Sequence, residues 1–277
     1  MTKRNILGLL PDILQAGSEV RRIYSTDFSV TWKGEDDPLT QADLISNQII
    51  SDCLKSYYPG DFVLSEEEKE EAHRIQNHYI WLLDPIDGTR EFVKKKPEFA
   101  ISLGLAIHGV AISGIVYNPI TDELVIADSE YGISSTVGNH TEVFWKQHLN
   151  NPPSSKPRCI VSHSEFSEGY FDDPFWSNNF EIQAIGSIAY KLALLAMGKF
   201  DLCISLRPKS DWDIGAGVAL VNASGGDSLD LVEFQPMRFN EKSIKKQGII
   251  SGNPEFLNDF LKKNRSQIHK FYSDLQN

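Results

Sequence analysis

The stretch WLLDPIDGTREF, residues 81–92, restricts the folding of this chain more than any other feature. The apolar run YIWLL before it has the length and composition of a buried strand, and this run ends directly at Asp84. Asp84 and Asp87 flank a Pro-Ile pair and are followed by glycine, so a turn is one interpretation. A turn needs one aspartate at most, so a turn alone does not explain the second carboxylate.

A divalent cation would explain it. A helix is expected to begin near Thr89, and the N–H groups at a helix start bind anions such as phosphate. Two carboxylates beside such an anion would repel it unless cations lie between them. Mg²⁺ takes oxygen ligands from a few carboxylates and from substrate phosphate, and a metal pair is a common solution in phosphate chemistry. The segment alone leaves both interpretations open.

Glu66 and Asp43 each have a structural interpretation beside a functional one. Glu66 directly follows the predicted strand 61–65 and opens the acidic run EEEKEE, which is typical of a solvated surface. Asp43 lies three positions after Thr40, which is the spacing of a capping box at a helix start. Either carboxylate can also join the site of Asp84.

Asp213 lies in SDWDIGAG, just before a helix of small residues predicted over 213–223. It fits the N-cap of that helix. Gly215, Ala216 and Gly217 would let the helix pack closely against a neighbouring element. Asp213 is the fifth acid that we consider for the site.

The order of predicted elements divides the chain into two halves. We expect an α+β half over 1–150, with an antiparallel sheet and most of the site acids, and an α/β half over 151–277. Residues 66–78 are interpreted as a mobile connection, 147–158 as a linker and 165–178 as a helix or loop. The expected helices are 5–24, 40–58, 187–197, 213–223 and 254–272, and the expected strands are 61–65, 79–83, three within 98–127, 159–162, 201–206 and 248–252.

Composition excludes several classes of protein. The net charge of −11 would repel nucleic-acid phosphates, so no nucleic-acid polymer is expected as a partner. The three cysteines form no CxxC pair, which favours a reducing cytoplasm. No apolar run is long enough for a membrane span.

Motifs of other phosphate and ester chemistries are absent. The sequence has neither a GxSxG elbow nor a GxxxxGK loop. The seven histidines form no pair at metal-binding spacing, and His163 is interpreted as a loop histidine. Nucleophilic serine and P-loop mechanisms are therefore disfavoured.

Three segments in this order resemble the lithium-sensitive, magnesium-dependent phosphomonoesterases of the inositol monophosphatase superfamily. They are VLSEE (63–67), WLLDPIDGTREF (81–92) and DWDIGAG (211–217). LTQAD (39–43) and GSIAYKLA (186–193) match two further segments of the family. The resemblance implies an α/β (α+β) fold, a layered α-β-α-β-α sandwich of the inositol monophosphatase/fructose-bisphosphatase type. It also implies two or three Mg²⁺ ions, a small phosphorylated metabolite as substrate, a possible homodimer and inhibition by Li⁺.

The resemblance also implies roles for individual residues. Metal ligands would be Glu66, Asp84, the Ile86 carbonyl, Asp87 and Asp213. Asp43 and Thr89 would activate the attacking water, and the Gly88 and Thr89 amides would hold the phosphate. Gly186 and Ser187 would line the leaving-group side. Lys191, Arg207 and Lys209 are candidates for binding a second phosphate.

Details of the motifs favour one branch of the family. Inositol phosphatases usually carry a glutamate seven residues before the last aspartate ligand, and here that position is Leu206. The residues after DGT, Arg90-Glu91-Phe92, are similar to the KEF of 3′(2′),5′-bisphosphate nucleotidases of the CysQ type. We therefore expect hydrolysis of the 3′-phosphate of adenosine 3′,5′-bisphosphate, although residues 188–191 depart from the usual nucleotidase segment. An inositol monophosphatase or broad sugar-phosphate phosphatase is the first alternative, and a catalytically silent metal- or ligand-binding regulator is the second.

Overall fold

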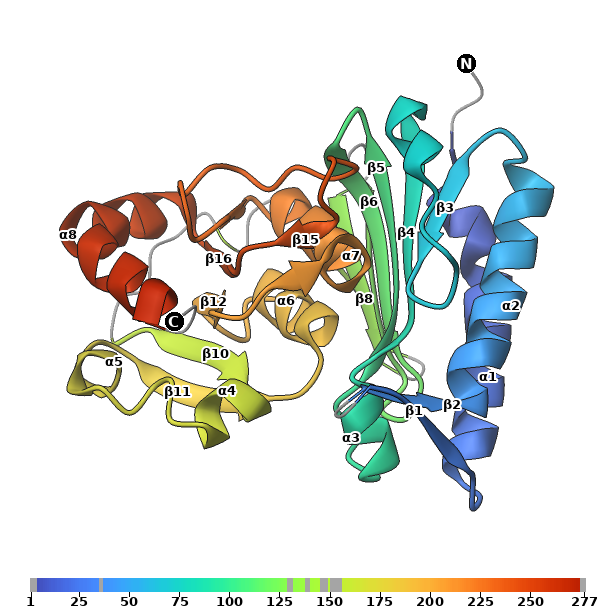
Figure 1. Ribbon diagram of the computed structural model, residues 1–277, viewed down its shortest axis with the longest axis horizontal. Helices are drawn as coiled ribbons and strands as arrows, with labels where there is room; N and C mark the ends of the chain where they lie inside the picture. The colour runs from blue at the N-terminus through green and yellow to red at the C-terminus, as the bar shows by residue number, and fades with distance from the viewer. Residues whose placement is uncertain are drawn as a thin grey trace.

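The computed structural model describes residues 4–34, 37–128, 132–137, 140–144, 149 and 156–274. Its elements form five layers, with α1 and α2 outside a seven-stranded sheet, α6 and α7 in the middle, then a five-stranded sheet, and α8 outside it (Figure 1). This arrangement confirms the predicted α-β-α-β-α sandwich. No helix within the described ranges has the length and apolar character to cross a membrane.

The first outer layer agrees closely with the sequence. The predicted first helix consists of a 3-10 turn, η1 (Ile6–Leu9), and α1 (Leu10–Tyr24), with Pro11 in the first turn as expected. Thr40 caps α2 (Gln41–Tyr57), and Asp43 completes the capping box. The hairpin of β1 (Val30–Gly34) and β2 (Asp37–Thr40) precedes α2.

The seven-stranded sheet has the order β3-β4-β5-β6-β7-β8-β9, with only β3 and β4 parallel. Its last two strands lie beyond the predicted meander. The strands are β3 (Phe62–Ser65), β4 (Tyr79–Asp87), β5 (Ala100–Ile107), β6 (Val110–Asn118), β7 (Glu123–Asp128), β8 (Gly132–Val137) and β9 (His140–Phe144).

Strand β4 shows why its apolar run is unbroken. Ile80 and Leu82 pack against the middle helices, whereas Trp81 and Leu83 pack against α1 and α2. Successive side chains of a strand point to opposite faces, and both faces of this sheet are covered by helices. The run is therefore buried on both sides, as the sequence predicts.

The middle layer consists of α6 (Ile188–Ala196) and α7 (Asp211–Ala223). The backbone of α7 lies directly on the sheet at Gly104 and Gly114. A Cβ at Gly114 would lie 2.5 Å from the Ala216 carbonyl oxygen, and one at Gly104 would lie 2.6 Å from the Ala216 nitrogen. The small residues of α7 permit this close packing, which brings the start of α7 to the sheet.

We expect Gly114→Ala to destabilise the protein by about 1–3 kcal/mol, because its methyl group would overlap α7. Gly60→Ala is the matched control, since a Cβ there meets no atom within 4 Å. Thermal unfolding of the two variants checks this. Equal unfolding temperatures would contradict the close packing of α7.

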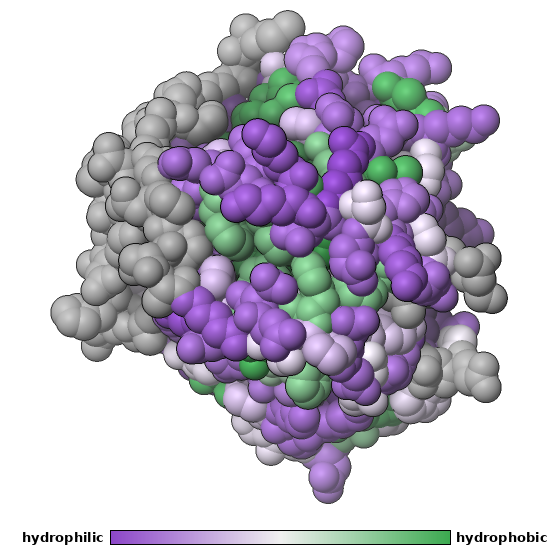
Figure 2. All heavy atoms as spheres, turned by 90° about the vertical axis from the view of Figure 1, so that its left-hand side faces the viewer, coloured by the Kyte–Doolittle hydropathy of each residue, from purple (hydrophilic) through white to green (hydrophobic). Residues whose placement is uncertain are grey.

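The five-stranded sheet has the order β11-β10-β12-β16-β14. Its outer face is covered by α5 (Pro174–Asn179) and α8 (Pro254–Asp274), while α4 (His163–Ser167) follows β10. From this side the surface is mostly hydrophilic, with apolar residues near its middle (Figure 2). The sequence did not predict β11 and β14; the strands are β10 (Arg158–Ser162), β11 (Glu181–Ile185), β12 (Leu202–Ser205), β14 (Asp227–Leu229) and β16 (Ile249–Gly252).

The connection 66–78 is more ordered than predicted. It contains the 3-10 helix η2 (Ala72–Gln76), in which Arg74 is fully buried. The Arg74 guanidinium donates to Glu70 at 2.7 Å and to the Asn240 side chain at 2.9 Å. This anchoring corrects the interpretation as a mobile segment.

Two predictions about chain organisation are not decided. Most of the predicted linker 147–158 lies outside the described residues. The seven-stranded sheet uses residues before 145 and the five-stranded sheet uses residues after 157. One apolar cluster joins the two parts, so the division at residue 150 stays a prediction.

Candidate active site

A β-bulge turns both aspartates of β4 toward one cleft. The partner of Asp84 on β5 is Ser102 and that of Asp87 is Ala100, so three steps on β4 match two on β5. Without the extra residue, two side chains three positions apart would point to opposite faces. Pro85 lies within the bulge, where its missing N–H is tolerated.

The cleft has a volume of about 670 Å³. It brings together most of the predicted site residues, which come from both halves of the chain. Those lining it are Glu66, Asp84, Ile86, Asp87, Gly88, Thr89, Gly186, Ser187, Lys191 and Asp213. Asp43 is not among the lining residues and lies behind Thr89.

Each of the three predicted aspartate ligands accepts its hydrogen bonds through one oxygen only. Asp84 accepts from the Ile86 N–H at 3.0 Å, and Asp213 accepts from the Ser210 N–H at 2.8 Å. Asp87 accepts from the Ser187 hydroxyl at 2.5 Å and from a backbone N–H of α6 at 2.6 Å. Among the described residues no hydrogen bond reaches the second oxygen of these aspartates.

Glu66 is held differently. One of its oxygens lies 3.3 Å from the Lys33 ammonium, which also contacts Glu67 at 2.6 Å. Lys33 belongs to β1, so the β1–β2 hairpin provides an ion-pair partner for Glu66 and Glu67. Lys33 was not predicted from the sequence.

Asp213 is not the N-cap of α7, contrary to the sequence interpretation. The helix begins at Asp211, Ser210 is its N-cap, and Asp213 is the third helical residue of a capping box. Asp43 has the same place in α2. In both cases the cap fixes one carboxylate oxygen, and the S/T-x-x-D spacing was visible in the sequence.

Asp43, Thr89 and the Ile86 carbonyl form a connected group. The Thr89 hydroxyl lies 3.1 Å from Asp43 Oδ1 and 3.0 Å from the Ile86 oxygen. Asp43 Oδ2 accepts from the Thr40 N–H at 2.8 Å and from the Thr40 hydroxyl at 2.6 Å. Asp43 therefore serves the helix cap and orients Thr89 at the same time.

Backbone geometry shapes the cleft at Gly88 and Gly186. Gly88 has φ +98° and is the N-cap of α3 (Thr89–Val93). A Cβ at Gly186 would lie 2.4 Å from Glu91 Cγ. Its N–H donates to Glu98 at 2.9 Å, and Glu98 also contacts His163 at 2.7 Å. His163 is the first residue of α4 and lines the cleft, whereas the sequence interpretation preferred a loop histidine to one near the site.

Lys191 does not have a free ammonium group. It is buried, and its Nζ donates to the carbonyls of Ile185, Gly186 and Ser187 at 3.1, 3.3 and 3.0 Å. An ammonium has three donors, so none remains for a phosphate. This geometry argues against the predicted substrate contact, and Lys191 instead supports the backbone of the segment before α6.

Other basic residues do face the cleft. Six basic and six acidic residues line it, in a chain whose net charge is −11. The basic ones are Arg90, Lys94, Lys96, Lys191, Arg207 and Lys209. Sequence reasoning proposed three of these and missed the other three, Arg90 in α3 and Lys94 and Lys96 in the run KKK after it.

The comparison with family models decides the classification. The model of the inositol monophosphatase family matches residues 11–270. The chain belongs to this family.

Relatives within the inositol monophosphatase family carry two kinds of name. The chain is 31% identical over 215 residues to the 3′(2′),5′-bisphosphate nucleotidase CysQ of Buchnera aphidicola, covering 76% of this chain and 78% of that protein. It is 27% identical over 249 residues to the inositol-1-monophosphatase of Bacillus subtilis, covering 87% and 89%. Both names denote phosphoric monoester hydrolases, and this chain is one as well.

A solved structure agrees with the fold. CysQ from Bacteroides thetaiotaomicron, a bacterial member of the inositol monophosphatase family, matches with a TM-score of 0.74 at 26% identity. The match covers 89% of this chain and 96% of that one. The resemblance to the family stated from the sequence is confirmed.

Burial raises the pKa of every acid at the centre of this inositol monophosphatase site. Burial and then the charge of Glu66 raise the pKa of Asp84 well above its ordinary range. Burial, followed by Asp87, raises the pKa of Asp213 to about 8. Burial raises the pKa of Glu66 to about 7 although Lys33 opposes it, and that of Asp43 to about 6 although Thr40 opposes it. Buried acids that repel one another call for a cation.

The acids fit such a cation by their chemistry. In the part of the chain that the structure describes, no three His, Cys, Asp or Glu side chains are assembled as a finished metal cluster. The acids nonetheless line one cleft, and the three aspartates each keep one oxygen without a protein donor. Carboxylate oxygens are the ligands that Mg²⁺ prefers.

We expect the metal-free protein to lose stability as the pH rises from roughly 4 to about 8, while the acids ionise. Their raised pKa values mean that the folded state keeps protons that the unfolded state has lost. Mg²⁺ binds the ionised carboxylates, so it should raise the unfolding temperature more at pH 8 than at pH 5. Thermal unfolding with EDTA and with millimolar Mg²⁺ measures this, and an equal Mg²⁺ effect at both pH values would contradict it.

Proposed function

We propose that the protein removes the 3′-phosphate from adenosine 3′,5′-bisphosphate with the help of two or three Mg²⁺ ions. The observation that carries this proposal is the charge pattern of one cleft, in which four acids suited to metals and several cations are combined. A substrate with two phosphates needs both. The similarity to nucleotidases named CysQ supports the same substrate class.

The proposed roles follow from the geometry of the site. Glu66, Asp84, Asp87, Asp213 and the Ile86 carbonyl would hold the ions, which supply an acidic water and neutralise phosphate charge. The Thr89 hydroxyl, oriented by Asp43, would take a proton from the attacking water while its own proton passes to Asp43.

The protein also provides for the phosphate and its leaving group. The N–H groups of Gly88, the N-cap, and Thr89, the first residue of α3, have no intrahelical acceptor and would bind phosphate oxygens. Gly186 and Ser187 would line the leaving-group side. Ser187 is tied to Asp87 by its hydroxyl, so the leaving-group wall and the metal site keep a fixed distance.

Arg207 and Lys209 are the proposed contacts for the second phosphate. Both line the cleft, and the Arg207 side chain is oriented by the Tyr170 hydroxyl at 3.0 Å. Because a bound phosphate carries charge, it can compete with Glu168, the present ion-pair partner of Arg207. Lys94 and Lys96 add positive charge at the same cleft.

An inositol monophosphatase is the second candidate, favoured by the similarity to the Bacillus subtilis enzyme. The position that usually carries the inositol-binding glutamate is Leu206, which is fully buried. Glu165 of α4, which accepts from the N–H groups of Leu206 and Arg207, is also fully buried. Neither side chain offers a free carboxylate to sugar hydroxyls.

A substrate panel with Mg²⁺ tests the proposal by phosphate release. We expect the highest kcat/KM for adenosine 3′,5′-bisphosphate, and inhibition by Li⁺. A higher kcat/KM for inositol 1-phosphate or a sugar phosphate would overturn the proposed substrate. No Mg²⁺-dependent release from any compound would favour the regulator instead.

A further inference from the structure

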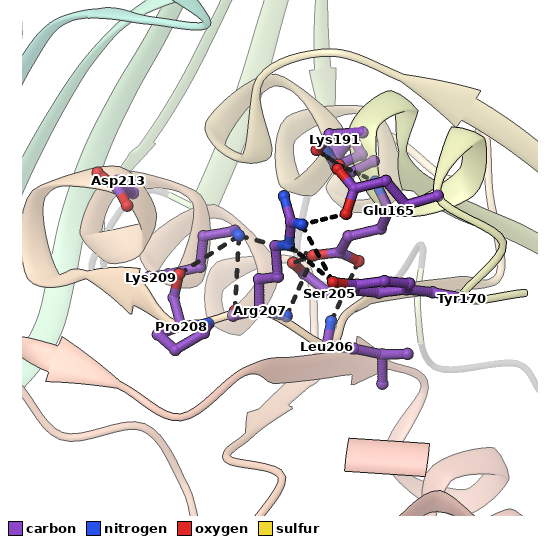
Figure 3. A network of polar contacts seen from close by, with 12 residues as sticks. Glu165, Tyr170, Lys191, Ser205, Leu206, Arg207, Pro208, Lys209 and Asp213 are labelled. Carbon is purple, nitrogen blue, oxygen red and sulfur yellow. Dashed lines mark hydrogen bonds and ion pairs between the residues drawn. The ribbon is translucent and has the colours of Figure 1, made fainter. Parts of the chain in front are cut away.

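Glu165 is a buried carboxylate that the proposed mechanism does not use. It lies in α4 with no exposed surface. Its Oε1 accepts from the Ser205 hydroxyl and from the Arg207 N–H, the latter at 3.1 Å. Its Oε2 accepts from the Leu206 N–H at 3.1 Å. A buried charge is costly unless it is fully paired, and here every partner comes from one short segment (Figure 3).

That segment carries two of the six basic residues that line the cleft. It leaves β12 at Ser205 and reaches α7 through Lys209. Leu206 packs into the apolar cluster under α8, whereas Arg207 and Lys209 line the cleft. The segment therefore passes from the core at Leu206 to the cleft at Arg207, where Glu165 binds its backbone.

Glu165 also balances charge behind the cleft. The Lys209 ammonium lies 3.7 Å from Glu165 Oε1, and Figure 3 shows Lys209 and Arg207 as neighbours along this segment. The Arg207 guanidinium lies over the Tyr170 ring at 5.2 Å. The hydrogen bond from the Arg207 N–H to Glu165 holds the backbone of Arg207, and the contact with the Tyr170 ring holds its guanidinium.

Within the described residues the hydrogen bonds of the Glu165 carboxylate go to Ser205, Leu206 and Arg207 and not to the predicted metal ligands. Burial raises the pKa of Asp87 and Asp213, although the charge of Lys209 opposes this rise. Asp213 is fixed by the Ser210 N–H, and α7 packs on β5 and β6 where Gly104 and Gly114 of those strands lie against Ala216. A change at Glu165 should therefore reach Arg207 and Lys209 before it reaches the metal ligands.

We propose that Glu165 is a positioning residue that sets specificity for the uncleaved phosphate of the substrate. It fixes the backbone of residues 205–207, and through it the directions of Arg207 and Lys209. This inference rests on the proposed function, because it needs a substrate with a second phosphate.

Glu165→Gln is the sharpest variant. In a glutamine one of the two oxygens becomes an NH₂ donor, and both oxygens of Glu165 now accept backbone N–H groups. Either orientation of the amide thus sets donor against donor, with little change in volume. Ser205→Ala removes a single donor and is the milder variant. Ser228→Ala is its matched control, since Ser228 is a buried hydroxyl of the same sheet that does not line the cleft.

Steady-state kinetics with two substrates tests the proposal. Adenosine 3′,5′-bisphosphate has the second phosphate and adenosine 3′-monophosphate lacks it. For Glu165→Gln we expect KM for the bisphosphate to rise about tenfold with kcat within about twofold, and both constants for the monophosphate to stay within about twofold. Ser205→Ala should raise the KM for the bisphosphate about threefold, and Ser228→Ala should leave it unchanged.

Other outcomes overturn the inference. If folded Glu165→Gln changes the kinetic constants equally for both substrates, or changes neither, Glu165 has a purely structural role. Should Glu165→Gln fail to fold, Ser205→Ala decides in the same way. A wild type that cleaves the monophosphate as well as the bisphosphate overturns the proposed function itself, and the role of Glu165 falls with it. If the wild type prefers the bisphosphate and the variants keep this preference, only the proposed role of Glu165 is refuted.

Discussion

Asp84→Asn is expected to lower kcat for phosphate release by about a thousandfold. Asp84 is 2% exposed and lines the cleft together with Glu66, Asp87 and Asp213. Asparagine keeps its size and its bond to the Ile86 N–H but removes one negative charge from the cation site. Metal ions contribute several kcal/mol to such reactions, and each 1.4 kcal/mol is about a factor of ten in rate. Phosphate release at saturating substrate and increasing Mg²⁺ measures the loss.

The same variant should be more stable than the wild type without metal. Burial and the charge of Glu66 raise the pKa of Asp84, so at pH 8 its titration favours the unfolded chain, in which the carboxylate ionises freely. Asparagine removes that cost. We expect a higher unfolding temperature in EDTA at pH 8 and a smaller rise on adding Mg²⁺. A loss of activity combined with a gain of metal-free stability cannot result from misfolding.

Asp128→Asn is the matched control. Asp128 is 8% exposed, accepts from the Ser113 hydroxyl at 2.9 Å, and does not line the cleft. It should keep kcat within about twofold. A wild-type kcat in Asp84→Asn, or an unchanged Mg²⁺ response, would contradict the role of Asp84 in a cation site.

The sequence predicts the parts of this site that depend on local pattern. A buried strand that ends in Asp84, a capping box at Thr40 and Asp43, and the small residues after Asp213 are each visible within a few positions. Their convergence in one cleft was inferred from the family resemblance. The bulge that turns Asp84 and Asp87 to the same side depends on pairing with β5, which no local pattern encodes.

Residues that act through distant partners escaped prediction. Arg74 lies in a polar run typical of solvated surface, and its partner Asn240 is 166 positions away. Glu165 lies in the polar stretch SHSEFSE, and its partners lie 40 to 42 positions away. The short strand β11 exists through its pairing with β10 alone, since strand formation depends on context more than on composition.

Lys191 shows the opposite error. A lysine beside a substrate segment suggests a phosphate contact, but three backbone carbonyls accept from its ammonium. The turn before α6 places these carbonyls together, with Ser187 at φ +48°. Only the folded backbone reveals that the donors of Lys191 are used.

Thr89→Val is expected to lower kcat by about 10²–10⁴-fold, the usual range for loss of a proton-transfer group. The Thr89 hydroxyl connects Asp43 Oδ1 to the cleft, and valine has a similar shape without the hydroxyl. Thr89→Ser restores the hydroxyl and should recover activity to within about tenfold of the wild type. Mg²⁺-induced stabilisation should persist in both variants, because the predicted metal carboxylates are unchanged. A valine variant with wild-type kcat would contradict this role.

A double-mutant cycle with Asp43→Asn tests whether Asp43 acts through Thr89. Asp43 Oδ2 accepts two bonds from Thr40, so asparagine should keep its oxygen there and turn its NH₂ toward the Thr89 hydroxyl. The hydroxyl then loses Asp43 as its proton acceptor and keeps only the Ile86 carbonyl, so kcat falls although Thr89 is present. Since both changes break one connection, the double variant should be no slower than Thr89→Val alone. Multiplied losses would instead show that Asp43 and Thr89 contribute separately.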